Sequence, residues 1–282
     1  MSTITKGVLV AVIFVLLIST IIYSDNSITD NLKNWDEHFN HIQSNSSGGR
    51  ERHVLMKDTS DISVATIIYN EDKMVDIYYP PDMDLSVPRP VLILIGLSDV
   101  EIKREYGIPY RHTGQALGWA QIVAEAGIVV LAHETSGMPK KDLVTLAEWV
   151  RTEGKEYGLD GQQIGLWSNS DSCDIAVKGI RPDKNGIPRP SVSFAVFYYG
   201  NLTAYSAMDP NVPILIVTAE SDGWTDMARI EKFIGKMSNI GSQVTHIHHS
   251  TGSHGFEMHE YKEETGTVIE QTITFMLEHS DF

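Results

Sequence analysis

Hydrophobic residues along the chain fall into short, nearly continuous runs separated by stretches of helical periodicity. The runs include "RPVLILIGL" (89–97), "IVVLAH" (128–133), "SVSFAVFYYG" (191–200) and "VPILIVTAE" (212–220). Runs of this length are typical of strands that are buried on both faces of a sheet. A helical stretch such as "ALGWAQIVAEAG" (116–127) leads directly into the next run. Repeated strand–helix units predict an α/β fold with a doubly wound, mostly parallel sheet.

The remaining elements complete this pattern. "ISVATIIY" (62–69) and "MVDIYYP" (74–80) predict an antiparallel pair of strands at the start of the sheet. Further strands are expected over 163–167 and 243–250, and further helices over 140–158, 171–178, 227–241 and 267–279. Ligand sites of doubly wound sheets lie beyond the carboxyl ends of the strands. Candidate chemistry is therefore sought at the strand ends.

The first apolar run is the longest. Residues 7–23, "GVLVAVIFVLLISTIIY", carry no charge and reach the lower limit of about 17 residues for a membrane-spanning helix. Lys6 precedes this run and Asp25 follows it, which favours a cytoplasmic N-terminus. A cleaved signal peptide is the alternative, although "IIYS" before Asp25 is a poor cleavage site. We expect residues 1–24 to be a transmembrane anchor, with the remainder on the extracytoplasmic side, or a signal segment whose removal leaves a secreted protein.

An amphipathic segment follows the apolar run. Five apolar residues recur there at spacings of four and three: Ile28, Leu32, Trp35, Phe39 and Ile42. This stripe predicts a short helix, and packing on the protein's own domain is favoured over a helix that lies on the membrane. "SNSSGG" (44–49) predicts a flexible break. The chain is thus divided into a stalk and linker over 25–60 and an α/β domain over 61–282.

Charge and cysteine content narrow the function. With 22 basic and 37 acidic residues, the formal net charge is -15. The phosphate backbone would be repelled by this charge and no basic run offsets it, so nucleic-acid binding is not expected. Cys173 is the only cysteine, which rules out an intramolecular disulfide. The core alone must hold the fold, and nothing in the composition predicts an oligomeric state.

Three predicted strand ends carry a nucleophile, an acid and a base. Ser170, in "WSNSDSC" (167–173), falls at a sharp turn from a strand to a helix. Asp222 follows the strand "ILIVTAE", and His254 lies in a glycine-flanked loop after the last strand. A serine hydroxyl attacks well only when a base takes its proton, and that base needs a carboxylate to orient it. We therefore expect Ser170, Asp222 and His254 to form a catalytic triad, which is in the chain order of such nucleophile turns.

Other residues compete for these roles. Glu220 and Asp226 are alternatives to Asp222, and Ser170 could serve only as a helix cap. Cys173 lies inside the predicted helix, where its sulfur cannot replace the Ser170 hydroxyl. Asp171 is likewise excluded as the nucleophile, because Ser170 and not Asp171 occupies the sharp turn.

A metal site is the alternative use of the histidines in "HIHH". His246 and His248 lie on one face of the predicted strand, but a zinc site needs further ligands from a nearby segment. Only His259 and Glu257 offer themselves, and neither belongs to a zinc-binding helix motif. No metal is predicted.

These pieces resemble the α/β-hydrolase family, specifically its dienelactone-hydrolase-like branch, over roughly residues 60–282. The resemblance rests on "RPVLILIGL", "AEAGIVVLAHE", "IGLWSNSDS", "ILIVTAESD" and "GSHGF". His254 in "SHGF" matches the family's catalytic histidine and is the most specific match. The elbow is the least specific match, because Ser168 and Ser172 stand where glycines are usual.

The resemblance also implies an oxyanion hole. Its donors would be the backbone N–H of Asp171 and that of Leu97 or Ser98, in the loop that follows the strand "RPVLILI". The family often has a His-Gly pair just before this loop, and this chain has Ile95-Gly96.

The fold and activity that the resemblance implies are those of a small esterase. The expected fold is an α/β-hydrolase fold without a large cap, since few residues separate the runs at 191–200 and 212–220. The site should therefore be fairly open and shaped by loops at 98–112 and 135–141. The implied enzyme is a serine hydrolase that cleaves a small-molecule carboxylic ester without a cofactor. Thioesterase and amidase activities use the same triad, and a degenerate scaffold that binds a ligand or partner without turnover is the alternative function.

Overall fold

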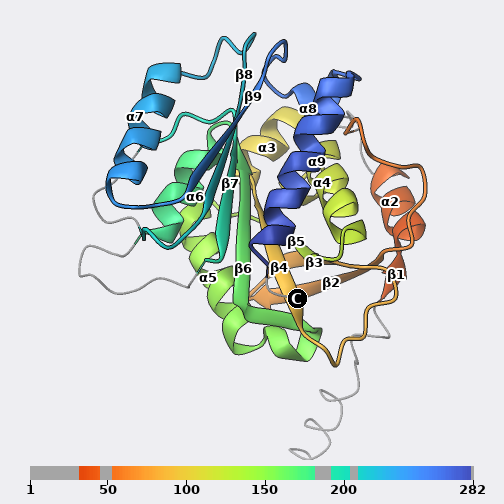
Figure 1. The fold of residues 1–282 in the computed structure, drawn as a ribbon. Coiled ribbons are helices and arrows are strands. Elements are labelled where there is room, and N and C mark those ends of the chain that lie inside the picture. Colours follow the sequence, from red (N-terminus) through yellow and green to blue (C-terminus); the bar gives the residue numbers. More distant parts are fainter. Residues whose placement is uncertain (1–31, 45–52, 182–191, 204–208, 281–282) are drawn as a thin grey trace, which may run out of the picture.

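The computed structural model describes residues 32–44, 53–181, 192–203 and 209–280, which form one nine-stranded sheet covered by helices (Figure 1). The strand order is β1-β2-β3-β5-β4-β6-β7-β8-β9. In chain order the strands are β1 (Lys33–Asn34), β2 (Ser63–Asn70), β3 (Lys73–Tyr79), β4 (Arg89–Ile95), β5 (Val129–His133), β6 (Leu159–Asn169), β7 (Phe194–Tyr198), β8 (Ile214–Ala219) and β9 (Val244–His249).

The sheet is antiparallel at its start and parallel over the rest. β1, β2, β3 and β5 pair antiparallel, whereas β5, β4, β6, β7, β8 and β9 pair parallel in that order. β4, β5, β7 and β8 are nearly all buried, as expected for strands covered on both faces, whereas the edge strand β9 is largely exposed. The predicted antiparallel start and mostly parallel sheet are both confirmed.

Helices cover the two faces of the sheet and enclose two separate hydrophobic clusters (Figure 1). Helices α2, α4 and α9 pack on one face, and α5, α6 and α7 pack on the other. The helices are α2 (Trp35–Ser44), α3 (Asp99–Tyr106), α4 (Gly114–Glu125), α5 (Pro139–Thr152), α6 (Ser172–Ile180), α7 (Met227–Asn239), α8 (Phe256–His259) and α9 (Glu263–Glu278), with 3-10 turns η2 (Tyr110–His112) and η3 (Gly154–Tyr157). This arrangement is the predicted doubly wound fold.

The predicted amphipathic stripe packs on the domain, as favoured from the sequence. Trp35 and Ile42 are buried, and Phe39 packs against the same hydrophobic cluster. The helix itself begins later than the stripe suggests, because Lys33–Asn34 pairs with β2 and the Asn34 side chain accepts a hydrogen bond from the Glu37 N–H at 2.9 Å. Residue 28 of the stripe lies outside the described residues.

The predictions for the N-terminal segment fall mostly outside the described residues. These include the apolar run at 7–23, the division at residue 24 and most of the predicted flexible break at 44–49. Among the residues that the structure describes, no helix combines the length and the apolar character needed to cross a bilayer.

The connection after β4, expected to be a loop over 98–112, is largely helical. Ser98 begins α3 by accepting a hydrogen bond from the Val100 N–H at 3.2 Å. Asp99 is buried at the base of this connection, where its carboxylate accepts hydrogen bonds from the Tyr110 N–H at 2.7 Å and the Thr135 N–H at 3.1 Å. These bonds tie the connection to the sheet and set one wall of the cavity described below.

Candidate active site

Ser170 lies at a strained turn between β6 and α6. Its φ angle is 49°, a left-handed conformation that is uncommon for a residue with a side chain. The Ser170 N–H donates to the Tyr198 carbonyl at 2.9 Å, and the Ser170 carbonyl accepts from the Cys173 N–H at 3.2 Å. These two bonds hold the turn in the geometry expected of a nucleophile elbow.

The two positions that usually hold glycine are filled by buried serines with satisfied hydroxyls. Ser168 donates to the Val196 carbonyl at 3.4 Å. The Ser172 hydroxyl donates to the Asn169 carbonyl at 2.7 Å and accepts from the Asn169 N–H at 3.0 Å. Because each hydroxyl has a backbone partner, the elbow accommodates serine at both positions.

The sheet brings the three predicted triad residues together. His254, between β9 and α8, places Nε2 3.0 Å from Ser170 Oγ and Nδ1 3.0 Å from Asp222 Oδ2. The register explains this juxtaposition, since Ala219 of β8 pairs with His249 of β9 and the following loops leave the same edge. An ionised Asp222 can only accept, so Nδ1 carries the proton and Nε2 is free to accept from the serine hydroxyl.

Asp222 occupies a buried site built to hold a carboxylate. Its side chain is 0% exposed. Burial alone would raise its pKa, but hydrogen bonds from the Thr225 hydroxyl, the Trp224 N–H and His254 outweigh burial and lower the pKa below its usual value. Asp222 is therefore ionised at neutral pH.

The two competing acids lie elsewhere. Glu220 is exposed and contacts His248 Nε2 at 3.1 Å, and Asp226 accepts from the Ala228 N–H at 3.0 Å at the start of α7. Within the described part of the chain, neither carboxylate forms a hydrogen bond with His254. Of these three acids, Asp222 is therefore the one that contacts His254.

Of the two predicted oxyanion donors that follow β4, Leu97 lines the cavity and Ser98 does not, while Asp171 directly follows Ser170 without lining the cavity itself. Ile95 pairs with Ser168 in neighbouring strands, so Leu97 and Ser170 leave the sheet side by side, and both line the cavity. Within the described residues, the N–H groups of Leu97 and Asp171 donate to no protein acceptor. Ser98 is buried at the start of α3 and is absent from the cavity lining.

The Asp171 side chain is exposed and makes no capping hydrogen bond in α6. A solvated carboxylate at this helix start is favoured by the helix dipole. Water screens its charge from the oxyanion position.

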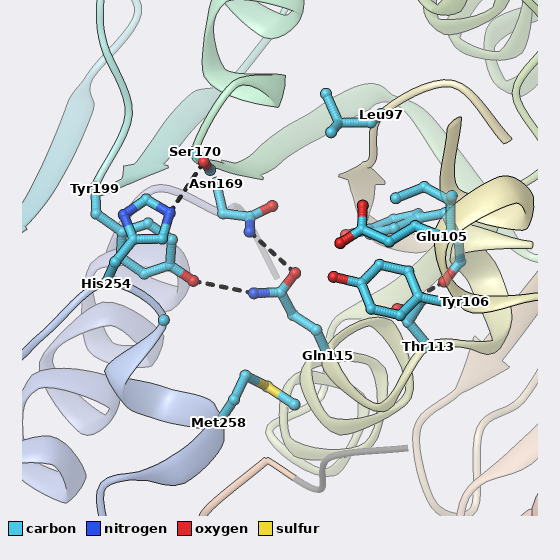
Figure 2. A pocket seen from close by; sticks show the side chains of 13 residues that line it. Leu97, Glu105, Tyr106, Thr113, Gln115, Asn169, Ser170, Tyr199, His254 and Met258 are labelled. Atoms are coloured by element: carbon cyan, nitrogen blue, oxygen red, sulfur yellow. Dashed lines mark hydrogen bonds between the residues drawn. The ribbon is translucent and has the colours of Figure 1, made fainter. Parts of the chain in front are cut away.

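A cavity of about 410 Å³ opens beside Ser170 and His254 (Figure 2). Part of its wall comes from α3 and η2, through Ile102, Glu105, Tyr106 and Tyr110. The other predicted wall, 135–141, contributes none of the lining residues among those described. The remaining lining residues are Leu97, Thr113, Gln115, Asn169, Tyr199, Gly255 and Met258.

Four polar residues near the triad form a hydrogen-bonded network that the sequence does not predict. Asn169 Nδ2 donates to Gln115 Oε1 at 3.0 Å, and Gln115 Nε2 donates to Tyr199 Oη at 3.0 Å and to Glu257 Oε1 at 2.9 Å. The Tyr199 hydroxyl also donates to Glu257 Oε1. From the sequence, Glu257 is a candidate only for metal binding, and no sequence signal marks Gln115.

His246 and His248 are exposed side chains of β9 that contact the neighbouring strand, whereas the single cysteine belongs to the hydrophobic core. His246 Nε2 and His248 Nδ1 both contact the Thr218 hydroxyl, at 2.8 and 2.9 Å, and no group of described residues could hold a metal ion. Cys173 is fully buried, and burial raises the pKa of its thiol to about 12. A thiol in this state is a poor nucleophile.

Comparison with known proteins identifies the fold. No protein-family model matches the sequence, and no curated protein matches it. Solved structures of esterase 2 from Thermogutta terrifontis, a thermophilic esterase from a Planctomycetes species, are similar. The apo form has a TM-score of 0.61 at 15% identity, and the butyrate-bound form has 0.57 at 14% identity. Each comparison covers 76% of this chain and 94% of the esterase chain.

The paraoxon-phosphorylated form of the same esterase gives a TM-score of 0.58 at 15% identity, over the same shares of the two chains. These likenesses establish an α/β-hydrolase fold. They do not distinguish branches of the family, so the dienelactone-hydrolase-like assignment stays a prediction.

Proposed function

We propose that this protein is a serine hydrolase that cleaves carboxylic esters through an acyl-enzyme intermediate. The observation that carries the proposal is the unbroken hydrogen-bonded chain from Ser170 Oγ through His254 to Asp222. The left-handed backbone at Ser170 and the similarity in fold to an esterase support it. A complete triad also favours turnover over the alternative of a degenerate binding scaffold.

Acylation begins when Ser170 Oγ forms a bond to the ester carbonyl carbon while its proton passes to His254 Nε2. Asp222 stabilises the resulting imidazolium through Nδ1. The N–H groups of Leu97 and Asp171 receive the negative oxygen, and each such donor contributes about 10²–10³ in rate. The tetrahedral intermediate then expels the alcohol, which takes the proton from His254.

Deacylation repeats the sequence with water as the nucleophile. His254 Nε2 removes a proton from water, whose oxygen bonds to the acyl carbon, and the bond to Ser170 Oγ breaks as that oxygen regains the proton. Every step uses groups of this chain, so we propose no cofactor. Thioesters and amides pass through the same intermediates and belong in the same substrate screen.

The cavity favours an uncharged acyl group. Figure 2 shows Glu105 and Tyr106 across the cavity from His254. No lysine or arginine lines the cavity among the described residues. A carboxylate on the substrate would meet the Glu105 carboxylate without a basic partner, and like charges brought together disfavour binding.

The test uses the full-length protein and two substrates, 4-nitrophenyl butyrate and a matched ester whose acyl chain ends in a carboxylate. The rate of hydrolysis is measured for each ester. We expect turnover of the neutral ester that is lost in Ser170→Ala. Because Glu105 is exposed and water screens its charge, kcat/KM should be about two- to fivefold lower for the anionic ester, which corresponds to at most about 1 kcal/mol. Glu105→Gln should narrow this gap. Glu101→Gln, an exposed position on the same helix outside the cavity, should leave it unchanged. A folded protein that turns over no ester, thioester or amide would contradict the hydrolase proposal.

A further inference from the structure

The polar residues on the cavity floor form one connected network that begins beside the nucleophile. Asn169 precedes Ser170, and its side-chain amide donates to Gln115 Oε1 at 3.0 Å. Gln115, near the start of α4, passes the connection to Tyr199 and Glu257 through the two hydrogens of its amide nitrogen. Figure 2 shows the Gln115 side chain between Asn169 and Tyr199, with both hydrogen bonds drawn.

The same network also contacts or adjoins His254, the general base of the triad, through two of its members, Tyr199 and Glu257. The Tyr199 ring packs against the His254 ring with centroids 4.5 Å apart. Glu257 follows His254 by three residues, in α8, and its carbonyl accepts from the Val54 N–H at 2.8 Å. The network therefore connects the strand end that carries Ser170 with the loop that carries His254.

Both N–H hydrogens of the Gln115 side-chain amide are donated within this network. Its amide nitrogen donates to Tyr199 Oη and Glu257 Oε1, and its amide oxygen accepts from Asn169. A primary amide supplies both functions at once, which neither a carboxylate nor an apolar side chain does. These groups are engaged with one another, so their role is to hold the site rather than to bind a substrate.

Glu257 takes part through only one of its two oxygens. It is fully buried, and Oε1 accepts from both Gln115 and Tyr199. Oε2 has no hydrogen-bond partner among the described residues. The network thus requires an acceptor oxygen at this position and makes no use of the second oxygen.

We propose that Gln115 is a positioning residue, which acts through Tyr199 and Glu257 to fix His254 at hydrogen-bonding distance from Ser170. This inference rests on the proposed serine-hydrolase function. Small displacements of reacting groups are costly, since an error of about 1 Å can reduce the rate about 100-fold.

The test compares Gln115→Met with Gln121→Met in the full chain. Gln121 is a matched control, because it is buried on the same helix and hydrogen-bonds the backbone N–H and carbonyl of Lys57, outside the cavity. Both changes remove partly buried hydrogen bonds, so both should lower the melting temperature. Only Gln115→Met should reduce kcat and the rate of fluorophosphonate labelling, by about 10- to 100-fold, with KM nearly unchanged.

A second pair of variants separates position from charge. Glu257→Gln keeps a carbonyl oxygen that can accept from Gln115 and Tyr199, so kcat should stay within a few-fold of the wild type and the pH profile should not shift. Glu257→Met lacks this oxygen, so its kcat should be reduced as much as that of Gln115→Met. Equal activity in Gln115→Met and Gln121→Met would overturn the inference. A large loss in Glu257→Gln, with a shifted pH profile, would overturn it in favour of an electrostatic role. An inert wild-type protein would instead count against the proposed function.

Discussion

Replacing Asp222 with asparagine should disable the triad while leaving the fold intact. Asp222 Oδ1 accepts two backbone hydrogen bonds, from Trp224 at 2.8 Å and Thr225 at 3.3 Å, so the amide oxygen of the variant must take this place. The amide nitrogen then lies at the Oδ2 position, 3.0 Å from His254 Nδ1. Because an amide NH₂ only donates, Nδ1 must accept and the ring proton moves to Nε2, facing Ser170.

The structural cost of this change is small. The Thr225 hydroxyl lies 2.6 Å from Asp222 Oδ2 and 2.8 Å from the Tyr199 carbonyl. In the variant it can donate to the Tyr199 carbonyl and accept from the new amide. The free energy of unfolding should therefore stay within about 1 kcal/mol of the wild-type value, since no buried group loses its partner.

The loss in activity should be large. A histidine in the wrong tautomer cannot accept the serine proton, which reduces kcat by about 10⁴-fold, or about 5.4 kcal/mol. The assay is ester hydrolysis at pH 7.5 with urea unfolding as the stability check, and Glu220→Gln is the control because Glu220 does not contact His254. Activity of Asp222→Asn within tenfold of the wild type would refute this role of Asp222, as would a comparable loss in Glu220→Gln.

Two further predictions concern stability. Arg111 Nη1 contacts Asp76 Oδ2 at 2.6 Å, and Asp76 is 0% exposed. Arg111→Met removes this guanidinium and leaves Asp76 with the Thr66 hydroxyl at 2.6 Å and the rings of His38 and His112 at 3.8 Å, so it should destabilise the protein by about 3 kcal/mol in urea unfolding. A loss below about 1 kcal/mol would count against a paired buried charge. Burial lowers the pKa of His53 to about 3, so the unfolded chain binds a proton below pH 6.5 that the folded protein excludes, and stability falls as the pH is lowered. His53→Leu should flatten the pH dependence of unfolding between about pH 6.5 and 4 by up to about 1.4 kcal/mol per pH unit, and an unchanged slope would disprove this origin.

Much of the fold could be predicted because its strands are unusually apolar. Runs such as 89–97 and 212–220 allow few structures other than buried strands, and the helices between them have clear periodicity. The α3 helix was missed because "DVEIKREY" is mostly charged and leaves only Ile102 buried among its apolar residues. Its stability comes from capping by Ser98 and from the tertiary bonds of Asp99, which a local pattern does not contain.

The candidate triad could also be predicted from the sequence, because the strands that carry it are parallel. Parallel strands place their carboxyl ends at one edge, so Ser170, Asp222 and His254 could be brought together from strand order alone. Gln115 and Glu257 could not, because they are 142 positions apart and meet only after the layers pack. A glutamine on an apolar helix carries no signal of such a partner.

The central claim is that Ser170 is an activated nucleophile. It is tested most directly by treating the full chain with a fluorophosphonate probe and locating the adduct by peptide mapping. We predict one adduct, on Ser170, that is absent from Ser170→Ala and strongly slowed in Asp222→Asn. A folded protein that takes up no probe, or takes it up at another serine, would contradict this claim and favour a scaffold that binds without catalysis.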